Sequence, residues 1–176
     1  MLIDNYYQIK NIIYFYKNLL TFWHNAVILK LFQGEKGRND LRITHEADYA
    51  IRVTYCLALA GEKQCAKDIS EATGVTLRFA LKILRKLTQS GITRSYKGVA
   101  GGYELNHSPS EISLGAIIEC IDGPIAINHC LANEFQCTHM GTQNECDFHR
   151  VFSEINRSLR DQLCSITMDR FLPPQK

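Results

Sequence analysis

Three cysteines and one histidine follow one another closely in the last third of the chain, and their spacing suits metal chemistry. Cys130 is followed by six residues and Cys137, then by eight residues and Cys146, then by two residues and His149. An iron–sulfur cluster needs four bonds from protein side chains, most often from thiolates, and three cysteines supply all but one. His149 is our first choice for the fourth ligand, because it follows Cys146 by three residues and would share a helix face with it.

Two other interpretations of these residues stay open. Three cysteines and one histidine also form a zinc set, but structural zinc sites generally use knuckles of two to four residues, and only Cys146 and His149 are that close. A disulfide between two of the cysteines would make a thiol switch and leave His149 without a role. The remaining cysteines lie singly among apolar or helical neighbours, where we expect small buried hydrophobes. They are Cys56, Cys65, Cys120 and Cys164.

Charge is spread unevenly along a chain whose formal net charge is only +2. Residues 41–107 contain ten Lys or Arg and six Asp or Glu, whereas residues 108–176 contain five and nine. No acidic residue occurs between Glu71 and Glu104, although six basic residues do. This local basic surface suits a polyanion such as DNA.

The basic region has the pattern of three helices followed by a hairpin. Thr44 can cap a first helix that ends near Gly61, a second helix is expected over residues 66–72, and Thr76 can cap a third. In the third helix four leucines are expected to face the core and the basic residues another side. The leucines are Leu77, Leu81, Leu84 and Leu87, and the basic residues are Arg78, Lys82 and Arg85.

A wing and a second helical region complete the predicted fold. Residues 92–97 and 103–105 alternate as strands do, around a glycine-rich tip that includes Gly98. Ser113 can cap a helix that Gly123 terminates, and a long amphipathic helix is expected over residues 147–171. The fold class is therefore mainly α with a small β-hairpin, a winged helix-turn-helix domain plus a long C-terminal dimerisation helix. The apolar stripe of that helix, which we expect to pair with a second subunit, is Phe148, Phe152, Ile155, Leu159, Leu163 and Ile166.

Three motifs and the spaced cysteines resemble the IscR and NsrR family of winged-helix transcription regulators. The motifs are LRITHEADYAIR at residues 41–52, SYKGVAGGY at 95–103 and IDGP at 121–124, and the resemblance runs from Leu41 to about Leu172. It implies a homodimer that binds double-stranded operator DNA through the third helix and the wing. It also implies an iron–sulfur cluster, 2Fe–2S or 4Fe–4S, beside the dimerisation helix.

The resemblance assigns roles to individual residues. In the third helix, Thr76, Arg78 and Lys82 would face the DNA groove, and Phe79 would support the helix against DNA or core. Lys97, beside Gly98 at the wing tip, stands where the family usually has an arginine that enters the minor groove, and lysine lacks the planar fit of arginine. Members similar to IscR share the Cys-x-x-His ending, which supports His149. In members similar to NsrR a carboxylate from the opposite subunit is the fourth ligand, and Asp48 is that alternative here.

The first forty residues lie outside the resemblance. Leu41 stands where family members begin with Met, and a UUG codon is read as Met when it initiates translation. Codons for residues 36–38 can form a purine-rich ribosome-binding site, so we expect residues 1–40 to be untranslated leader rather than an added helix. The predicted division is then 1–40 as an extension, 41–107 as the DNA-binding domain and 108–176 as the cluster and dimerisation region.

No enzyme motif is evident. We find no phosphate-binding loop, no nucleotide fingerprint and no nucleophile–base–acid set. No stretch is long and apolar enough to span a bilayer, and the start lacks the features of a secretory signal. We expect a cytoplasmic, homodimeric regulator, a repressor that senses redox state, iron or nitric oxide through its cluster.

Overall fold

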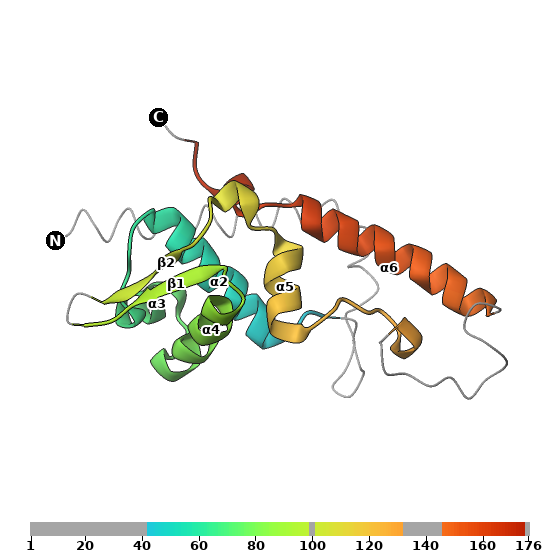
Figure 1. The fold of residues 1–176 in the computed structure, drawn as a ribbon, viewed down its shortest axis with the longest axis horizontal. Coiled ribbons are helices and arrows are strands. Elements are labelled where there is room, and N and C mark those ends of the chain that lie inside the picture. The colour runs from blue at the N-terminus through green and yellow to red at the C-terminus, as the bar shows by residue number, and fades with distance from the viewer. Residues whose placement is uncertain (1–41, 99–100, 132–145, 175–176) are drawn as a thin grey trace. The chain divides into compact units, whose positions relative to one another are not determined.

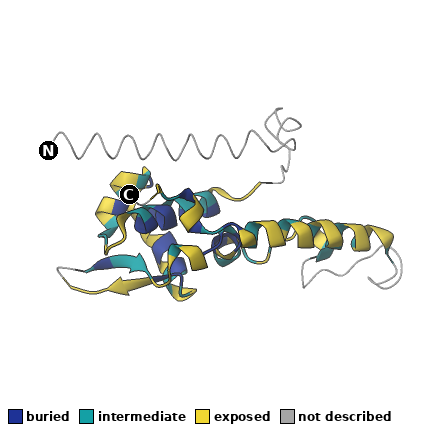
Figure 2. Ribbon diagram, turned by 90° about the horizontal axis from the view of Figure 1, so that it is seen from above, coloured by how far each residue is buried: buried dark blue, intermediate teal, exposed yellow. Residues whose placement is uncertain are grey.

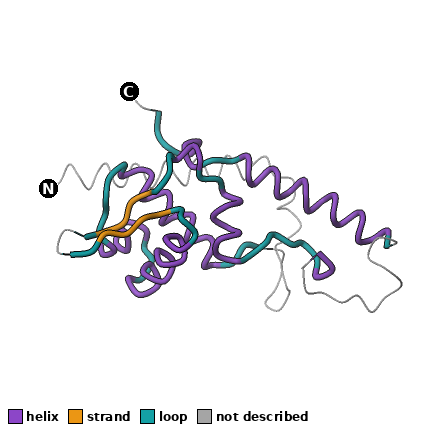
Figure 3. The backbone as a smooth tube through the Cα atoms, in the orientation of Figure 1, coloured by secondary structure: helices purple, strands orange, loops and turns teal. Residues whose placement is uncertain are grey.

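The computed structural model describes residues 42–98, 101–131 and 146–174. These residues form five α-helices and one two-stranded antiparallel sheet (Figures 1 and 3), so the prediction of a mainly α fold with a small hairpin is confirmed. None of the described helices is long and apolar enough to cross a membrane. In chain order the elements are α2 (His45–Ala60), α3 (Ala66–Thr73), α4 (Leu77–Gln89), β1 (Thr93–Tyr96), β2 (Gly102–Leu105), α5 (Leu114–Asp122) and α6 (Asp147–Ser165), with 3-10 turns η2 (Pro109–Glu111), η3 (His129–Leu131) and η5 (Met168–Phe171).

Local signals set most helix ends. The Thr44 hydroxyl accepts a hydrogen bond from the Ala47 amide at 3.1 Å, and α2 ends at Gly61, whose φ of 64° places it in the left-handed region. The Ser113 hydroxyl caps α5 in the same way, through the amide of Ala116. Thr76 precedes α4 as expected, but its side chain makes no capping hydrogen bond.

The core lies between α2, α3, α4 and α5 and is closed by η5. Figure 2 shows the buried residues gathered in this bundle rather than in α6. Because α5 packs on α2 and α4, the core contains residues from both sides of the domain boundary predicted between residues 107 and 108. The division of the chain at that boundary stays a prediction. The largest fully buried side chains are Leu57, Ile69, Ile83, Leu84, Leu87, Ile117, Met168 and Val53, together with Thr54 and Thr93.

The prediction that all four leucines of α4 face the core is wrong for two of them. Leu77 is 43% exposed and Leu81 is 42% exposed. The buried face of α4 consists instead of Ala80, Ile83, Leu84 and Leu87. At about 100° per residue, Leu81 lies roughly 110° from the centre of that face. Ala80, which is fully buried, lies near the centre of that face.

An isolated β-bridge attaches the wing to the loop between α2 and α3. β1 and β2 pair in antiparallel register from Thr93 opposite Leu105 to Tyr96 opposite Gly102. Gln64, in the loop between α2 and α3, exchanges two backbone hydrogen bonds with Tyr103, at 2.9 and 2.8 Å. A Cβ at Gly102 would lie 2.6 Å from the Gln64 carbonyl oxygen, so this close approach needs glycine.

The C-terminal helix is shorter than predicted, because it ends at Ser165 rather than near residue 171. The chain then forms a bridge with the segment before α5: the Leu114 amide donates to the Ile166 carbonyl, and the Met168 amide donates to the Ile112 carbonyl, both at 2.9 Å. Ile166, expected on the dimerisation stripe, and Met168 are buried in the winged domain. Burial of these side chains outweighs the continuation of the helix.

Candidate DNA-binding surface and cysteine segment

The outer side of α4 and the wing form the candidate DNA-binding surface. Thr76 just before α4, Arg78 and Lys82 on α4, and Lys97 and Gly98 on the wing are all exposed. Gly98 has a φ of 96°, which favours glycine at this tight turn. All five residues therefore lie on the solvent side, and their contacts with DNA stay a prediction.

Phe79 and Lys82 are tied to α2. The Phe79 ring meets Tyr49 edge to face, with 5.7 Å between ring centroids, so Phe79 supports α4 against α2. The Lys82 ammonium is 2.8 Å from Oε2 of Glu46 and 5.5 Å from the centroid of the Phe79 ring. The hydrogen bonds from Lys82 first, and then from Lys86, lower the pKa of Glu46. Lys82 is thus held at one side of the surface by a carboxylate.

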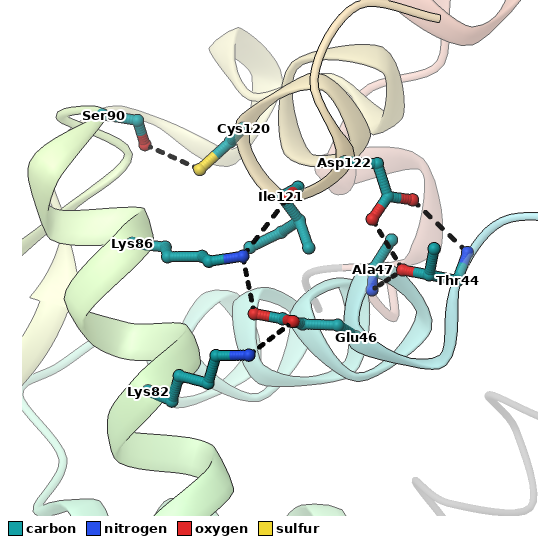
Figure 4. Close-up of polar contacts among 9 residues, drawn as sticks. All are labelled: Thr44, Glu46, Ala47, Lys82, Lys86, Ser90, Cys120, Ile121 and Asp122. Atoms are coloured by element: carbon teal, nitrogen blue, oxygen red, sulfur yellow. Dashed lines mark hydrogen bonds and ion pairs between the residues drawn. The ribbon is translucent and has the colours of Figure 1, made fainter.

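A polar network connects the beginning of α2 with α4 and the end of α5 (Figure 4). The Lys86 ammonium lies 2.7 Å from Oε1 of Glu46 and donates to the Ile121 carbonyl oxygen at 3.3 Å. Asp122 accepts from the Thr44 hydroxyl at 2.6 Å and from the Thr44 amide at 3.3 Å. This network explains the IDGP motif: its carboxylate holds the N-terminus of α2, which favours negative charge.

In the wing, charges are neutralised at the base and exposed at the tip. Nε of Arg94 is 2.6 Å from Oε1 of Glu104, and the Tyr96 hydroxyl donates to the same oxygen at 2.6 Å. The hydrogen bond from Tyr96 first, and then that from Arg94, lower the pKa of Glu104. Lys97 at the tip makes no ion pair with any residue that the structure describes, so its charge is available for an anion.

The structure describes three of the four predicted cluster ligands. Cys130 lies in η3, Cys146 is the N-cap residue of α6, and His149 lies in the first turn of that helix. All three are partly exposed, and Cys137 lies outside the described residues. Within residues 42–98, 101–131 and 146–174, no three His, Cys, Asp or Glu side chains gather closely enough to hold a metal ion.

The segment that carries Cys130 is fixed to one face of α6 by Asn156. The Asn156 side chain accepts from the Ile127 amide at 3.0 Å and donates to the Ile125 carbonyl at 2.9 Å. The turn η3 packs against α6 just beyond this point. His149 lies two helical turns before Asn156 and therefore on the same face as this segment. Its Nδ1 is buried and has no hydrogen-bond partner among the described residues.

Comparison with known proteins decides the family. The model of the Rrf2 family, described as an iron-dependent transcriptional regulator, matches residues 43–174. The chain belongs to the Rrf2 family. A relative in Mycobacterium tuberculosis, named as an HTH-type transcriptional regulator, is 38% identical over 88 residues, which are 49% of this chain and 55%, about half, of the relative. IscR of Pectobacterium carotovorum is 27% identical over 136 residues, covering 75% of this chain and 79% of IscR.

The solved structures agree with this assignment at the level of fold. CymR, the global cysteine regulator of B. subtilis, superposes with a TM-score of 0.59 at 20% identity, covering 74% of this chain and 95% of CymR. The expected family and fold are thus confirmed. The relatives in the Rrf2 family are transcription regulators and not enzymes, as the sequence led us to expect.

The alternative ligand of this Rrf2 protein, Asp48, has a local partner. Its Oδ2 lies 2.8 Å from the guanidinium of Arg52, one turn further along α2. Such a partly exposed pair within one helix is weak, so the contact does not prevent Asp48 from acting as a ligand. The choice between His149 and Asp48 stays a prediction.

The four single cysteines are partly exposed rather than fully buried, and the sequence missed their contacts. The Cys65 sulfur caps α3 by accepting from the Asp68 amide at 3.4 Å, and Cys120 donates to the Ser90 hydroxyl at 3.1 Å. Burial first, and the charge of Asp68 second, raise the pKa of the Cys56 thiol to about 11. Cys164 packs where α5 and α6 touch, since a Cβ at Gly115 would lie 2.5 Å from its sulfur.

Proposed function

We propose that this Rrf2 protein is a cytoplasmic DNA-binding repressor whose operator affinity is controlled by an iron–sulfur cluster. Cys130, Cys137, Cys146 and His149 would hold the cluster, of the 2Fe–2S or 4Fe–4S type. The description of the family as iron-dependent and the relationship to IscR support this choice. The cluster would supply a group that changes with iron supply, oxidation or nitric oxide.

The observation that carries the proposal is the environment of His149. A buried nitrogen without a partner costs free energy, and a bond to a metal centre would remove that cost. Nδ1 of His149 has no hydrogen-bond partner in the part of the chain that the structure describes. His149 follows Cys146 by one turn and lies on the face of α6 against which the segment with Cys130 is held. The contact between α6 and the segment with Cys130 supports ligands that are distant in sequence, which suits a cluster better than a zinc knuckle.

DNA binding is supported by the charge of the outer side of α4. Arg78 and Arg85 are exposed and make no ion pair with any described residue, in contrast to Lys82 and Lys86. Recognition helices of this type place such side chains in the major groove, while a wing residue such as Lys97 contacts the backbone or minor groove. Arginine can bind guanine through two hydrogen bonds, so Arg78 is our candidate for base recognition.

The exposed side of α6 supports a homodimer. Phe148, Val151 and Ile155 are 74%, 46% and 51% exposed, and they recur at steps of three and four residues. None of the residues of α6 is fully buried within the chain. Pairing with α6 of a second copy would cover this stripe, in the manner of a coiled coil. A cluster beside the two helices can then change the separation of two α4 helices that must fit grooves one DNA turn apart.

The first test is anaerobic purification of the full chain, followed by visible absorption and determination of iron and acid-labile sulfide. We expect a brown protein that binds its selected operator with different affinity before and after removal of the cluster. The variant His149→Ala should lose the cluster or change its spectrum, whereas Asp48→Ala and the control His107→Ala, an exposed histidine outside this segment, should not. A change in Asp48→Ala alone would assign the fourth bond to Asp48.

The second candidate is a regulator of the same fold with a zinc or thiol-switch site. The superposition on CymR, the global cysteine regulator of B. subtilis, supports this candidate. A colourless protein that contains zinc would establish the first form. A colourless, metal-free protein in which Cys130 or Cys146 forms a disulfide on oxidation would establish the second, and either result would refute the cluster.

A further inference from the structure

Two leucines on the outer side of α4 have no covering partner within the described chain. Leu77 and Leu81 are 43% and 42% exposed, and no other leucine of α4 is comparably exposed. Exposed apolar side chains are common singly, but these two are one helical turn apart and lie on the same side of the helix. The pair therefore forms an apolar strip along α4.

The strip borders the basic residues of α4. At about 100° per residue, Leu81 lies roughly 40° from Arg85 and roughly 60° from Arg78 around the helix axis. Both arginines are exposed and unpaired among the described residues. Lys82 lies on the far side of the arginines, where Glu46 and Phe79 hold it. The outer side of α4 thus consists of two leucines, then two arginines, then an anchored lysine.

An apolar strip beside unpaired arginines matches the major groove better than it matches an apolar protein surface. A protein partner that buried the leucines would also have to neutralise the arginines, and α4 itself contains no acidic residue. DNA provides phosphates for the arginines, and the major groove displays one kind of apolar group, the 5-methyl of thymine. Leu77 and Leu81 are about 6 Å apart along the helix, close to two base-pair steps of about 3.4 Å.

We propose that Leu77 and Leu81 contact thymine methyl groups in the operator and thereby contribute to the selection of the operator sequence. This inference rests on the proposed DNA binding, and it adds apolar recognition of thymine to the polar recognition expected of Arg78. The two leucines would select thymines about two base pairs apart in each half-site. Leu77 lies in the first turn of α4, where recognition helices contact base edges. The thymine that Leu77 contacts should therefore contribute more to sequence preference than the one that Leu81 contacts.

The test uses duplexes selected by the full chain from a random-sequence library. The best duplex is synthesised again with uracil in place of each thymine in turn, which removes only the methyl group. We expect the wild-type chain to bind about fourfold more weakly for each contacted methyl that is removed. At one thymine position of the duplex, Leu81→Ala should bind the thymine and uracil forms with equal affinity. Leu77→Ala should do the same at a different thymine position. Ile43→Ala, a matched change at an exposed apolar residue outside α4, should keep the full preference.

The base change leaves the protein intact, so the wild-type measurement does not depend on the folding of any variant. Equal binding of thymine and uracil duplexes by the wild-type chain would overturn the inference while leaving DNA binding established. Undiminished thymine preference in both leucine variants would also overturn it. Selection of no duplex at all would refute the proposed function itself.

Discussion

Replacement of Glu46 by glutamine should lower stability and strengthen DNA binding at the same time. The Glu46 side chain is only 19% exposed and forms ion pairs with two lysines of α4, at 2.8 Å to Lys82 and 2.7 Å to Lys86. An exposed ion pair contributes up to about 1 kcal/mol, and a carboxylate in the first turn of a helix adds about 0.3–1 kcal/mol. Because both lysines are partly screened by water, we expect Glu46→Gln to cost about 1–2 kcal/mol, a fall in Tm of about 2–8 °C for a chain of this size.

This stabilisation should depend on pH in a defined direction. The lysines lower the pKa of Glu46 below its ordinary value of 4.5. A carboxyl group whose pKa is lower in the folded state stabilises the fold above its unfolded pKa, and that contribution is lost as the pH falls through the folded pKa. The difference between wild type and Glu46→Gln should therefore be full near neutral pH and should shrink below pH 4.5.

The measurement is urea denaturation followed by circular dichroism at about pH 7 and about pH 3, with Glu62→Gln as the control. Glu62 is exposed and makes no ion pair among the described residues, so its replacement should change stability little. DNA affinity is measured in parallel as a function of salt. In Glu46→Gln, Lys82 no longer has a carboxylate partner at residue 46 and can contact a DNA phosphate. The slope of log binding constant against log salt concentration should then become steeper by about one unit. Equal destabilisation at both pH values, or none at neutral pH, would refute the role given to the two ion pairs.

Three further predictions address the other parts of the chain. Ile155→Glu should give monomers by sedimentation, because it places a charge in the exposed stripe of α6, whereas Arg157→Glu, about 160° away around the helix, should leave the dimer intact. Met168→Ala should cost about 2–5 kcal/mol in urea denaturation, because this side chain is fully buried under α2, and a cost below about 1 kcal/mol would contradict that packing. Lys97→Ala should reduce the slope of log DNA affinity against log salt concentration by about one. Arg78→Ala should instead relax base preference by about 1–3 kcal/mol at one position. Unchanged DNA affinity in both variants would refute the assigned docking.

The sequence predicted the parts of this fold that depend on near neighbours. Thr44, Gly61 and Ser113 bound their helices as expected, because a cap needs only the amides or carbonyls of the next turn. The hairpin follows from alternation around a glycine-rich tip in the same local way. Residues 146–149 also adopt the expected start of a helix, whereas the metal site expected from the cysteine and histidine spacing stays a prediction.

Tertiary structure decided the features that depend on distant segments. The apolar periodicity of α4 could not show which leucines are buried, since Leu77 and Leu81 fit the same pattern as Leu84 and only the neighbouring helices select the packed face. The end of α6 at Ser165 was equally hidden, because it depends on backbone hydrogen bonds to residues 112 and 114, about fifty positions earlier. The same holds for the Asp122 carboxylate on Thr44 and the Asn156 amide on residues 125 and 127. A local pattern determines which elements form, but the orientation of each element requires partners that only the folded chain brings together.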